Sequence, residues 1–113
     1  MDVRQQMTLP PTPSADRIPP EIRELVKEYR IELTDGRIFM LRLDRGVLRL
    51  EERTAEADCS LRCSAEMLHR FLNGEANLMT ALMRGDVRVT GDLEAGKRLY
   101  RYLRLATGTG GTA

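Results

Sequence analysis

Residues 57–74 read ADCSLRCSAEMLHRFLNG, and this stretch decides the fold. From Asp58 to Cys63 small or apolar residues alternate with polar ones, which is the two-residue period of a strand with one buried face. Ser64 is a good helix N-cap, and Asn73-Gly74 is a typical helix end. Between them, apolar residues recur at helical spacing at Met67, Leu68, Phe71 and Leu72. The stretch therefore predicts a strand that runs into a short amphipathic helix.

Downstream of this unit the sequence predicts a second short helix, a short strand and a final helix. A second short helix over residues 78–84 is expected to stop at Gly85. A last short strand at residues 87–89 follows, Gly91 turns the chain, and Asp92 caps the final helix. The residues expected to face inward on that helix are Leu93, Gly96, Leu99, Tyr100 and Leu103.

Upstream, alternating residues predict a three-stranded antiparallel meander. Asp35-Gly36 is a strong hairpin signal between residues 29–34 and 37–44, and Arg45-Gly46 leads into residues 47–51. A first helix of about two turns is expected from roughly Pro20 to Glu28, after prolines that suit a helix start. The predicted order of elements is α-β-β-β-β-α-α-β-α.

Residues 57–103 resemble the core of the SCP-2 sterol-carrier family, whose sterol-binding domain has glycines at matching places. The order and spacing of Gly74, Gly85 and Gly91-Asp92 carry the resemblance, and the hairpins before them fit the same pattern. It implies an α/β (α+β) fold, SCP2-like, in which helices cover a mixed five-stranded sheet and an aliphatic tunnel lies between them. The chain departs from the family at its start, because the long first helix of full-length members is shortened here.

Length and composition fit one soluble globular domain. The 113 residues support a single core, with 42% hydrophobic and 31% charged residues. A net charge of +1 and few aromatic residues argue against nucleic-acid binding. All five prolines fall within the first twenty residues, so we expect a disordered arm at 1–17, a lipid-binding domain at 18–106 and a flexible tail at 107–113.

Compartment and metal chemistry can also be read from residue usage. No apolar segment opens the chain or approaches the roughly 20 residues of a membrane span, so we expect a cytoplasmic protein. The basic residues are almost all arginine, which favours a GC-rich bacterial source.

Cys59 and Cys63 would lie about 13 Å apart along one strand, too far for a disulfide, and are expected to be reduced, buried thiols. With one histidine and no CxxC pair, we expect no metal site and no cofactor.

Ten apolar residues are the candidate ligand-binding residues of the tunnel. The alternative is that they pack against one another as an ordinary core, since apolar stripes at helical spacing are typical of cores. Methionine fits either role, because its unbranched side chain repacks easily. The candidates are Phe39, Leu41, Leu68, Phe71, Leu72, Leu78, Met79, Leu82, Met83 and Leu103.

No catalytic constellation is found in the sequence. His69, the one imidazole, falls on the polar side of its helix, and no serine, cysteine or carboxylate is placed by sequence to form a relay with it. Domains of the SCP-2 kind are appended to enzymes, where the resemblance implies that they assist binding, so we do not expect an enzyme. Lys97, Arg98, Arg101 and Arg104 form a basic strip that would either touch anionic headgroups or remain a solvated face.

Two functions follow from these observations. In the first, which the resemblance implies, the chain binds a sterol, fatty acyl or isoprenoid molecule, and transfers or presents it, with transient contact to a membrane surface. In the second, the slot has collapsed and the chain is a non-catalytic interaction or structural subunit, such as a homodimer. The sequence does not distinguish ligands, because an apolar slot presents no hydrogen-bonding pattern.

Overall fold

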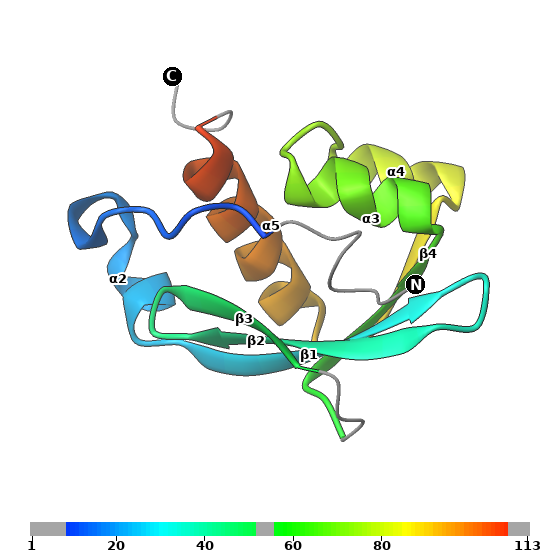
Figure 1. Cartoon of the computed structure of the whole chain (residues 1–113), viewed down its shortest axis with the longest axis horizontal. Helices are drawn as coiled ribbons and strands as arrows, with labels where there is room; N and C mark the ends of the chain where they lie inside the picture. Colours follow the sequence, from blue (N-terminus) through cyan, green and yellow to red (C-terminus); the bar gives the residue numbers. More distant parts are fainter. Residues whose placement is uncertain (1–8, 52–55, 109–113) are drawn as a thin grey trace.

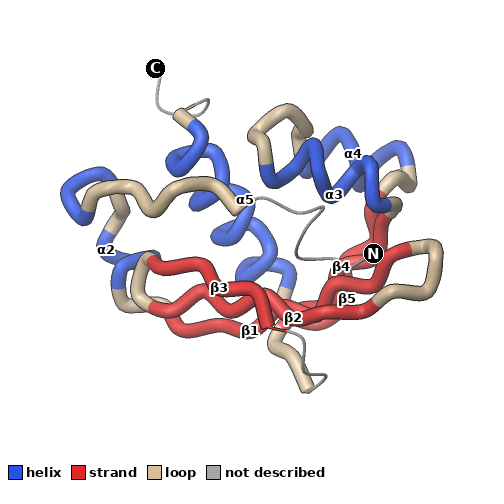
Figure 2. The backbone as a smooth tube through the Cα atoms, in the orientation of Figure 1, coloured by secondary structure: helices blue, strands red, loops and turns tan. Residues whose placement is uncertain are grey.

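A single five-stranded sheet organises the protein, a computed structural model of which describes residues 9–51 and 56–108. Figures 1 and 2 show that the helices of these residues all lie on one face of the sheet. The strands are β1 (Val26–Leu33), β2 (Ile38–Asp44), β3 (Val47–Glu51), β4 (Cys59–Cys63) and β5 (Val87–Gly91).

The sheet is mixed, as predicted, with the order β3-β2-β1-β4-β5. β1 pairs antiparallel with β2 and parallel with β4, while β2–β3 and β4–β5 are antiparallel. The parallel pair sets Tyr29 beside Cys59 and Leu33 beside Cys63. The strand of residues 57–74 therefore lies next to the central strand and leads straight into the helical layer.

The helices are η1 (Ala15–Arg17, a 3-10 turn), α2 (Pro20–Arg23), α3 (Ala65–Leu72), α4 (Leu78–Arg84) and α5 (Leu93–Thr107). Two predicted N-caps are confirmed: the Ser64 hydroxyl accepts from Met67 N–H at 3.0 Å, and Asp92 Oδ1 accepts from Ala95 N–H at 3.1 Å. Gly85 ends α4 in the left-handed conformation, as predicted.

The first helix is shorter than the prediction from Pro20 to Glu28. It makes one turn, and the chain enters β1 at Val26, which pairs with Asp44 of β2. The Leu25 carbonyl accepts a hydrogen bond from Arg45 N–H at 2.9 Å, which continues the contact between the strands. Long-range pairing thus takes the backbone groups that further helical turns would have needed.

Part of the predicted arm is in contact with the fold. Residues 1–8 of the arm at 1–17, and residues 109–113 of the tail at 107–113, lie outside the described residues. From Leu9 onward the chain runs on the helical side of the sheet, and Leu9 packs against the core. Residues 107 and 108 belong to the end of α5, which finishes at Thr107 with Gly108 as its C-cap.

Two tyrosines fasten α5 to the rest of the protein. The Tyr29 hydroxyl donates to the Ala95 carbonyl at 2.6 Å, and the Tyr102 hydroxyl donates to the Gly46 carbonyl at 2.8 Å. Both side chains are fully buried. Burial raises the pKa of both phenols above their ordinary value. These bonds hold the C-terminal helix against the sheet from β1 at one end to the β2–β3 turn at the other.

The inner face of α5 differs from the prediction at three residues. Leu93, predicted to face inward, is 41% exposed, whereas Ala95 and Tyr102, absent from the predicted face, are fully buried. The buried face is centred near Leu99, and at 100° per residue Leu93 lies about 120° away from that centre. The prediction was wrong at Leu93 because it extended the apolar stripe by one residue into the first turn.

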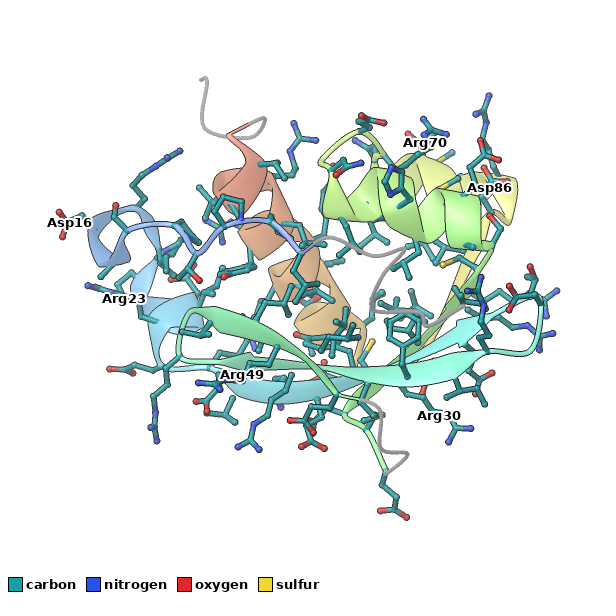
Figure 3. The ribbon with its side chains drawn as sticks, viewed as in Figure 1. Asp16, Arg23, Arg30, Arg49, Arg70 and Asp86 are labelled. Atoms are coloured by element: carbon teal, nitrogen blue, oxygen red, sulfur yellow. The ribbon has the colours of Figure 1, made fainter. Side chains whose placement is uncertain are left out.

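No helix of the described residues covers the opposite face of the sheet. Arg30 and Arg49 project from it, together with other charged side chains (Figure 3). Met40 also lies on this face and is only 1% exposed, with Arg30 and Glu51 as its neighbours on the adjacent strands. The apolar residues of the molecule are therefore concentrated between the sheet and the helices, which is where a ligand site must be sought.

Candidate lipid-binding cavity

An apolar cavity lies between the sheet and the helices α3, α4 and α5. Its volume is about 30 Å³. Every strand except β3 contributes to its wall, together with one face of each of the three helices. The lining residues are Ile31, Leu41, Leu61, Cys63, Leu68, Phe71, Leu72, Leu78, Val87, Gly96, Leu99, Tyr100 and Leu103.

This cavity is closed to a lipid in the present conformation. A single water molecule needs roughly 10–15 Å³, and pockets that bind small molecules begin at roughly 300 Å³. At ~24 cal/mol per Å³ the empty cavity of about 30 Å³ costs only ~0.7 kcal/mol, so the closed form is inexpensive to maintain. The tunnel implied by the resemblance is therefore not seen in this conformation, where the space between sheet and helices is a void of about 30 Å³, too small for an acyl chain.

Six of the ten candidate residues lie in the wall of this cavity. Phe39 is buried in the same core but does not reach the wall. Leu82 is half-buried and packs at the edge of the core, again outside the wall. The six that line the cavity are Leu41, Leu68, Phe71, Leu72, Leu78 and Leu103.

The two methionines of α4 lie on its exposed side. Met79 is 52% and Met83 is 86% exposed, while Leu78 and Ala81 are buried. The inner face of this short helix is formed by Leu78, Ala81 and Leu82, and at 100° per residue Met79 and Met83 lie about 100° and about 140° away from Leu78. The predicted role of these methionines as ligand contacts has no support from their position in the closed form.

Seven wall residues were not among the candidates. Register explains how they meet, because Ile31 lies beside Leu61 across the parallel pair, and Cys63 lies beside Val87 across β4–β5. The other three lie on consecutive turns of α5, where helical spacing had already predicted that they face inward. For the four strand residues, the signal that could have identified them was their position on one face of the sheet, which requires the strand order. They are Ile31, Leu61, Cys63, Val87, Gly96, Leu99 and Tyr100.

The seam between α3 and α5 is closed by an aromatic pair. The rings of Phe71 and Tyr100 meet edge to face, with centroids 6.4 Å apart and planes at 88°. Tyr100 is half-buried, and its hydroxyl accepts a hydrogen bond from Arg104 Nη1 at 2.6 Å. The Arg104 guanidinium carbon also lies 5.5 Å from the centre of the Tyr100 ring. One edge of an otherwise apolar wall thus carries a hydroxyl and a cation.

Both cysteines are buried free thiols. Burial, followed by the nearby carboxylates of Asp92 and Asp58, raises the pKa of Cys59 to about 11. Burial alone raises the pKa of Cys63 to about 11. A thiol with so high a pKa is almost wholly protonated at neutral pH and is a poor nucleophile. Cys63 therefore acts as an apolar wall residue of the cavity.

His69 is exposed on α3, and its Nε2 lies 3.0 Å from the side-chain nitrogen of Asn73. The cavity wall contains neither residue. In the described part of the chain, histidine, cysteine, aspartate and glutamate side chains form no group of three that could hold a metal ion.

The basic strip of α5 is partly neutralised by neighbouring acids. Lys97 Nζ lies 3.3 Å from Glu94, and Arg101 Nη1 lies 3.0 Å from Glu21 of α2. These are exposed pairs, and each contributes little to stability. The strip is therefore less cationic than its sequence indicates.

Two larger hollows lie on the surface beside β4 and β5, with volumes of about 330 and 240 Å³. Both include Arg62 and Arg88, which are direct partners across β4–β5. Their lining mixes polar and apolar surface, in contrast to the almost wholly apolar cavity beneath the helices. The apolar cavity is the better candidate for a hydrophobic ligand.

None of the helices in residues 9–51 and 56–108 is both long and apolar enough to cross a membrane.

Solved structures share this arrangement. The UbiJ-SCP2 ubiquinone synthesis protein superposes with a TM-score of 0.64 at 19% identity, covering 81% of this chain and 76% of that chain. Sterol carrier protein 2 from Yarrowia lipolytica, in its apo form, gives 0.55 at 19% identity, covering 82% and 75%. The sec-alkylsulfatase Pisa1 from Pseudomonas sp. gives 0.62 at 22% identity, but this chain spans only 14% of that enzyme.

No curated protein matches the sequence. The sequence model of the SCP-2 sterol transfer family does match it, over residues 12–104. That match extends from the segment preceding η1 to the last turns of α5, and so includes every element that lines the cavity. The chain belongs to the SCP-2 sterol transfer family.

Proposed function

We propose that the chain binds one hydrophobic, lipid-like molecule between its sheet and its helical layer and holds it for transfer or presentation. The observation that carries this proposal is the cavity, whose wall is almost entirely apolar and is shared by four strands and three helices. Membership of a sterol transfer family supports lipid binding in general terms. A sterol, a fatty acyl chain and an isoprenoid all suit such a wall, and the name of the UbiJ-SCP2 neighbour supports the isoprenoid.

Binding requires the cavity to widen. Opening it to ~300 Å³ would cost about 7 kcal/mol if it stayed empty. Filling it with about ten methylenes returns ~8 kcal/mol, from which the cost of association is subtracted. We therefore expect weak binding with broad selectivity for the apolar tail. A carrier with these properties releases its cargo readily.

The α3–α4 pair is the part of the helical layer that we expect to move. α5 is fastened to the body by the buried hydroxyls of Tyr29 and Tyr102. α3 instead meets α5 through the Phe71–Tyr100 ring contact, and α4 packs mainly against β5. Separating α3 from α5 would open the wall along its aromatic seam and leave the core around α5 intact.

Lipid extraction tests the proposal. The freshly purified chain is denatured in organic solvent and its extract is examined by mass spectrometry, and the delipidated chain is titrated with the neutral fluorescent probe N-phenylnaphthylamine. We expect co-purified lipid and saturation at one probe per chain. Val87→Phe, in the cavity wall, should weaken probe binding at least tenfold, while Val47→Phe, at a half-exposed strand position, should not. Equal binding by the two folded variants would contradict the proposed site.

A second function is favoured by one observation, the closed form of the cavity. In this alternative the chain is a non-catalytic interaction subunit, and the exposed Met79 and Met83 of α4 belong to a contact with a second copy. It predicts a stable dimer in sedimentation equilibrium, no extractable lipid and no saturable probe binding. Dissociation of that dimer by Met83→Glu, with no effect on folding, would support it over the carrier.

A further inference from the structure

We propose that Tyr100 and Arg104 form a head-group site at the rim of the cavity, and that this site selects an amphiphile whose polar end is a carboxylate. The inference rests on the proposed lipid-binding function and adds to it the chemistry of the preferred ligand. Its starting point is the single exception in the wall, because Tyr100 carries the only hydroxyl among the lining residues.

The hydroxyl of Tyr100 differs from those of the other two tyrosines. The hydroxyls of Tyr29 and Tyr102 donate to backbone carbonyls, so their protons are already used in holding α5. The oxygen of Tyr100 instead accepts from Arg104 Nη1 at 2.6 Å. Since a guanidinium can only donate, the phenolic proton is left to donate to another group. Tyr100 is half-buried, so part of its side chain is exposed to solvent, from which such a group would approach.

Arg104 shares with Arg98 the lack of a carboxylate within salt-bridge distance among the described residues, and Arg104 is the one that is hydrogen-bonded to the wall residue Tyr100. Lys97 and Arg101 have carboxylate neighbours at 3.3 and 3.0 Å. Among the described residues, no carboxylate lies within salt-bridge distance of Arg104, whose contacts are the hydroxyl and the ring of Tyr100. The guanidinium is half-buried and keeps further N–H groups for a partner.

Together these two side chains present only donors. They lie one helical turn apart on α5, so their spacing is fixed by the helix. A carboxylate has two acceptor oxygens and a negative charge, and it would take one hydrogen bond from the phenol and another from the guanidinium. The apolar tail would then run past Phe71 into the space between α3 and α5. An alcohol would make the phenol bond but would gain nothing from the charge.

The test compares two ligands with the same tail. Affinities of decanoate and decanol for the delipidated chain are measured by isothermal titration calorimetry, at concentrations below micelle formation. We expect decanoate to bind about tenfold more tightly than decanol, the effect of one charge-assisted hydrogen bond in a half-exposed site. Arg104→Gln should remove most of that preference without changing the affinity for decanol. Tyr100→Phe should weaken decanoate binding about threefold to fivefold.

Arg101→Gln is the matched control, because it removes an equal charge from the same helix at a residue that contacts Glu21 and not the cavity. It should leave both affinities within twofold of the parent. Equal affinities of the parent for decanoate and decanol, unchanged by Arg104→Gln, would overturn the head-group site while the lipid-binding function stands. Failure of both ligands to bind would overturn the site and the proposed function together.

Discussion

Phe71 of α3 and Tyr100 of α5 meet edge to face, with ring centroids 6.4 Å apart, across the seam between these two helices in the cavity wall. This contact joins the α3–α4 pair to α5 within the helical layer. It is also the place where an apolar wall meets a polar rim, because the Tyr100 hydroxyl is bound by Arg104. The proposed binding of a lipid in the cavity is expected to open this seam.

Phe71→Ala should destabilise the protein and loosen the seam. The side chain is only 8% exposed, and truncating a buried phenylalanine typically costs about 3 to 5 kcal/mol. We expect a loss near the lower end of that range, measured as the free energy of unfolding in urea. Met83→Ala, at a side chain that is 86% exposed, should change it by less than about 0.5 kcal/mol. Similar losses in the two variants would contradict the packing described for α3 and α4.

Gly91→Ala and Gly85→Ala separate two costs of replacing glycine. Both glycines have positive φ, at 88° and 78°. At Gly85 an added Cβ meets nothing within 4 Å, so we expect only the backbone cost of about 1 kcal/mol. At Gly91 it would lie 2.7 Å from the Asp58 carbonyl oxygen, and we expect the loss to exceed the Gly85 value by at least ~1 kcal/mol. Thermal unfolding of the two variants measures the two losses of stability. Equal losses would argue against the close approach of the Asp58 carbonyl, just before β4, to Gly91 at the end of β5.

Asp92 should make stability depend on pH. The hydrogen bond from Ala95 N–H lowers the pKa of this carboxyl below its ordinary 3.8, and Lys27 adds to the effect. A group with a lowered folded-state pKa stabilises fully above its unfolded pKa and loses this contribution as pH falls through the folded value. Asp92→Asn keeps a neutral cap. We therefore expect the parent to be more stable than the variant at pH 7, with the difference shrinking by pH 3. An equal difference in melting temperature at both pH values would refute this.

Alkylation of Cys63 should report the opening of the cavity. With a pKa of about 11, the thiol should react with iodoacetamide at pH 8 about a hundredfold more slowly than in the unfolded chain. Cys63 lines the cavity, whereas Cys59 does not. Bound decanoate should therefore slow labelling of Cys63 more than that of Cys59, as followed by peptide mass spectrometry. Equal effects on the two cysteines would indicate global unfolding in place of local opening.

Local features were predictable from the sequence. The caps at Ser64 and Asp92 and the stop at Gly85 depend on residues within one turn, and all three are confirmed. The bounds of β3 at Val47–Glu51 also match, because a turn signal and a short alternating run define them. Where neighbouring residues alone set the conformation, sequence patterns were sufficient.

Features that depend on distant residues were not predictable in the same way. The helix expected up to Glu28 yields to strand pairing with β2, a contact that no local pattern reports. The closed state of the cavity depends on how closely the side chains of four strands and three helices pack against one another, and a local sequence pattern does not report this packing. The Tyr100–Arg104 pair is an exception, since its separation of four residues on a helix could have been read directly.

The most direct test of lipid binding between sheet and helices is to locate a bound lipid. The methyl-labelled, delipidated protein is mixed with a fatty acid that carries a nitroxide near the end of its tail, and line broadening of methyl signals is recorded by NMR. We predict strong broadening at Leu41 and Leu68 in the cavity wall, and much weaker broadening at Leu48, a core residue outside the wall. Broadening restricted to the exposed Met79 and Met83, with Leu41 and Leu68 unaffected, would show that the lipid binds the outer surface of α4 and would contradict binding in the cavity.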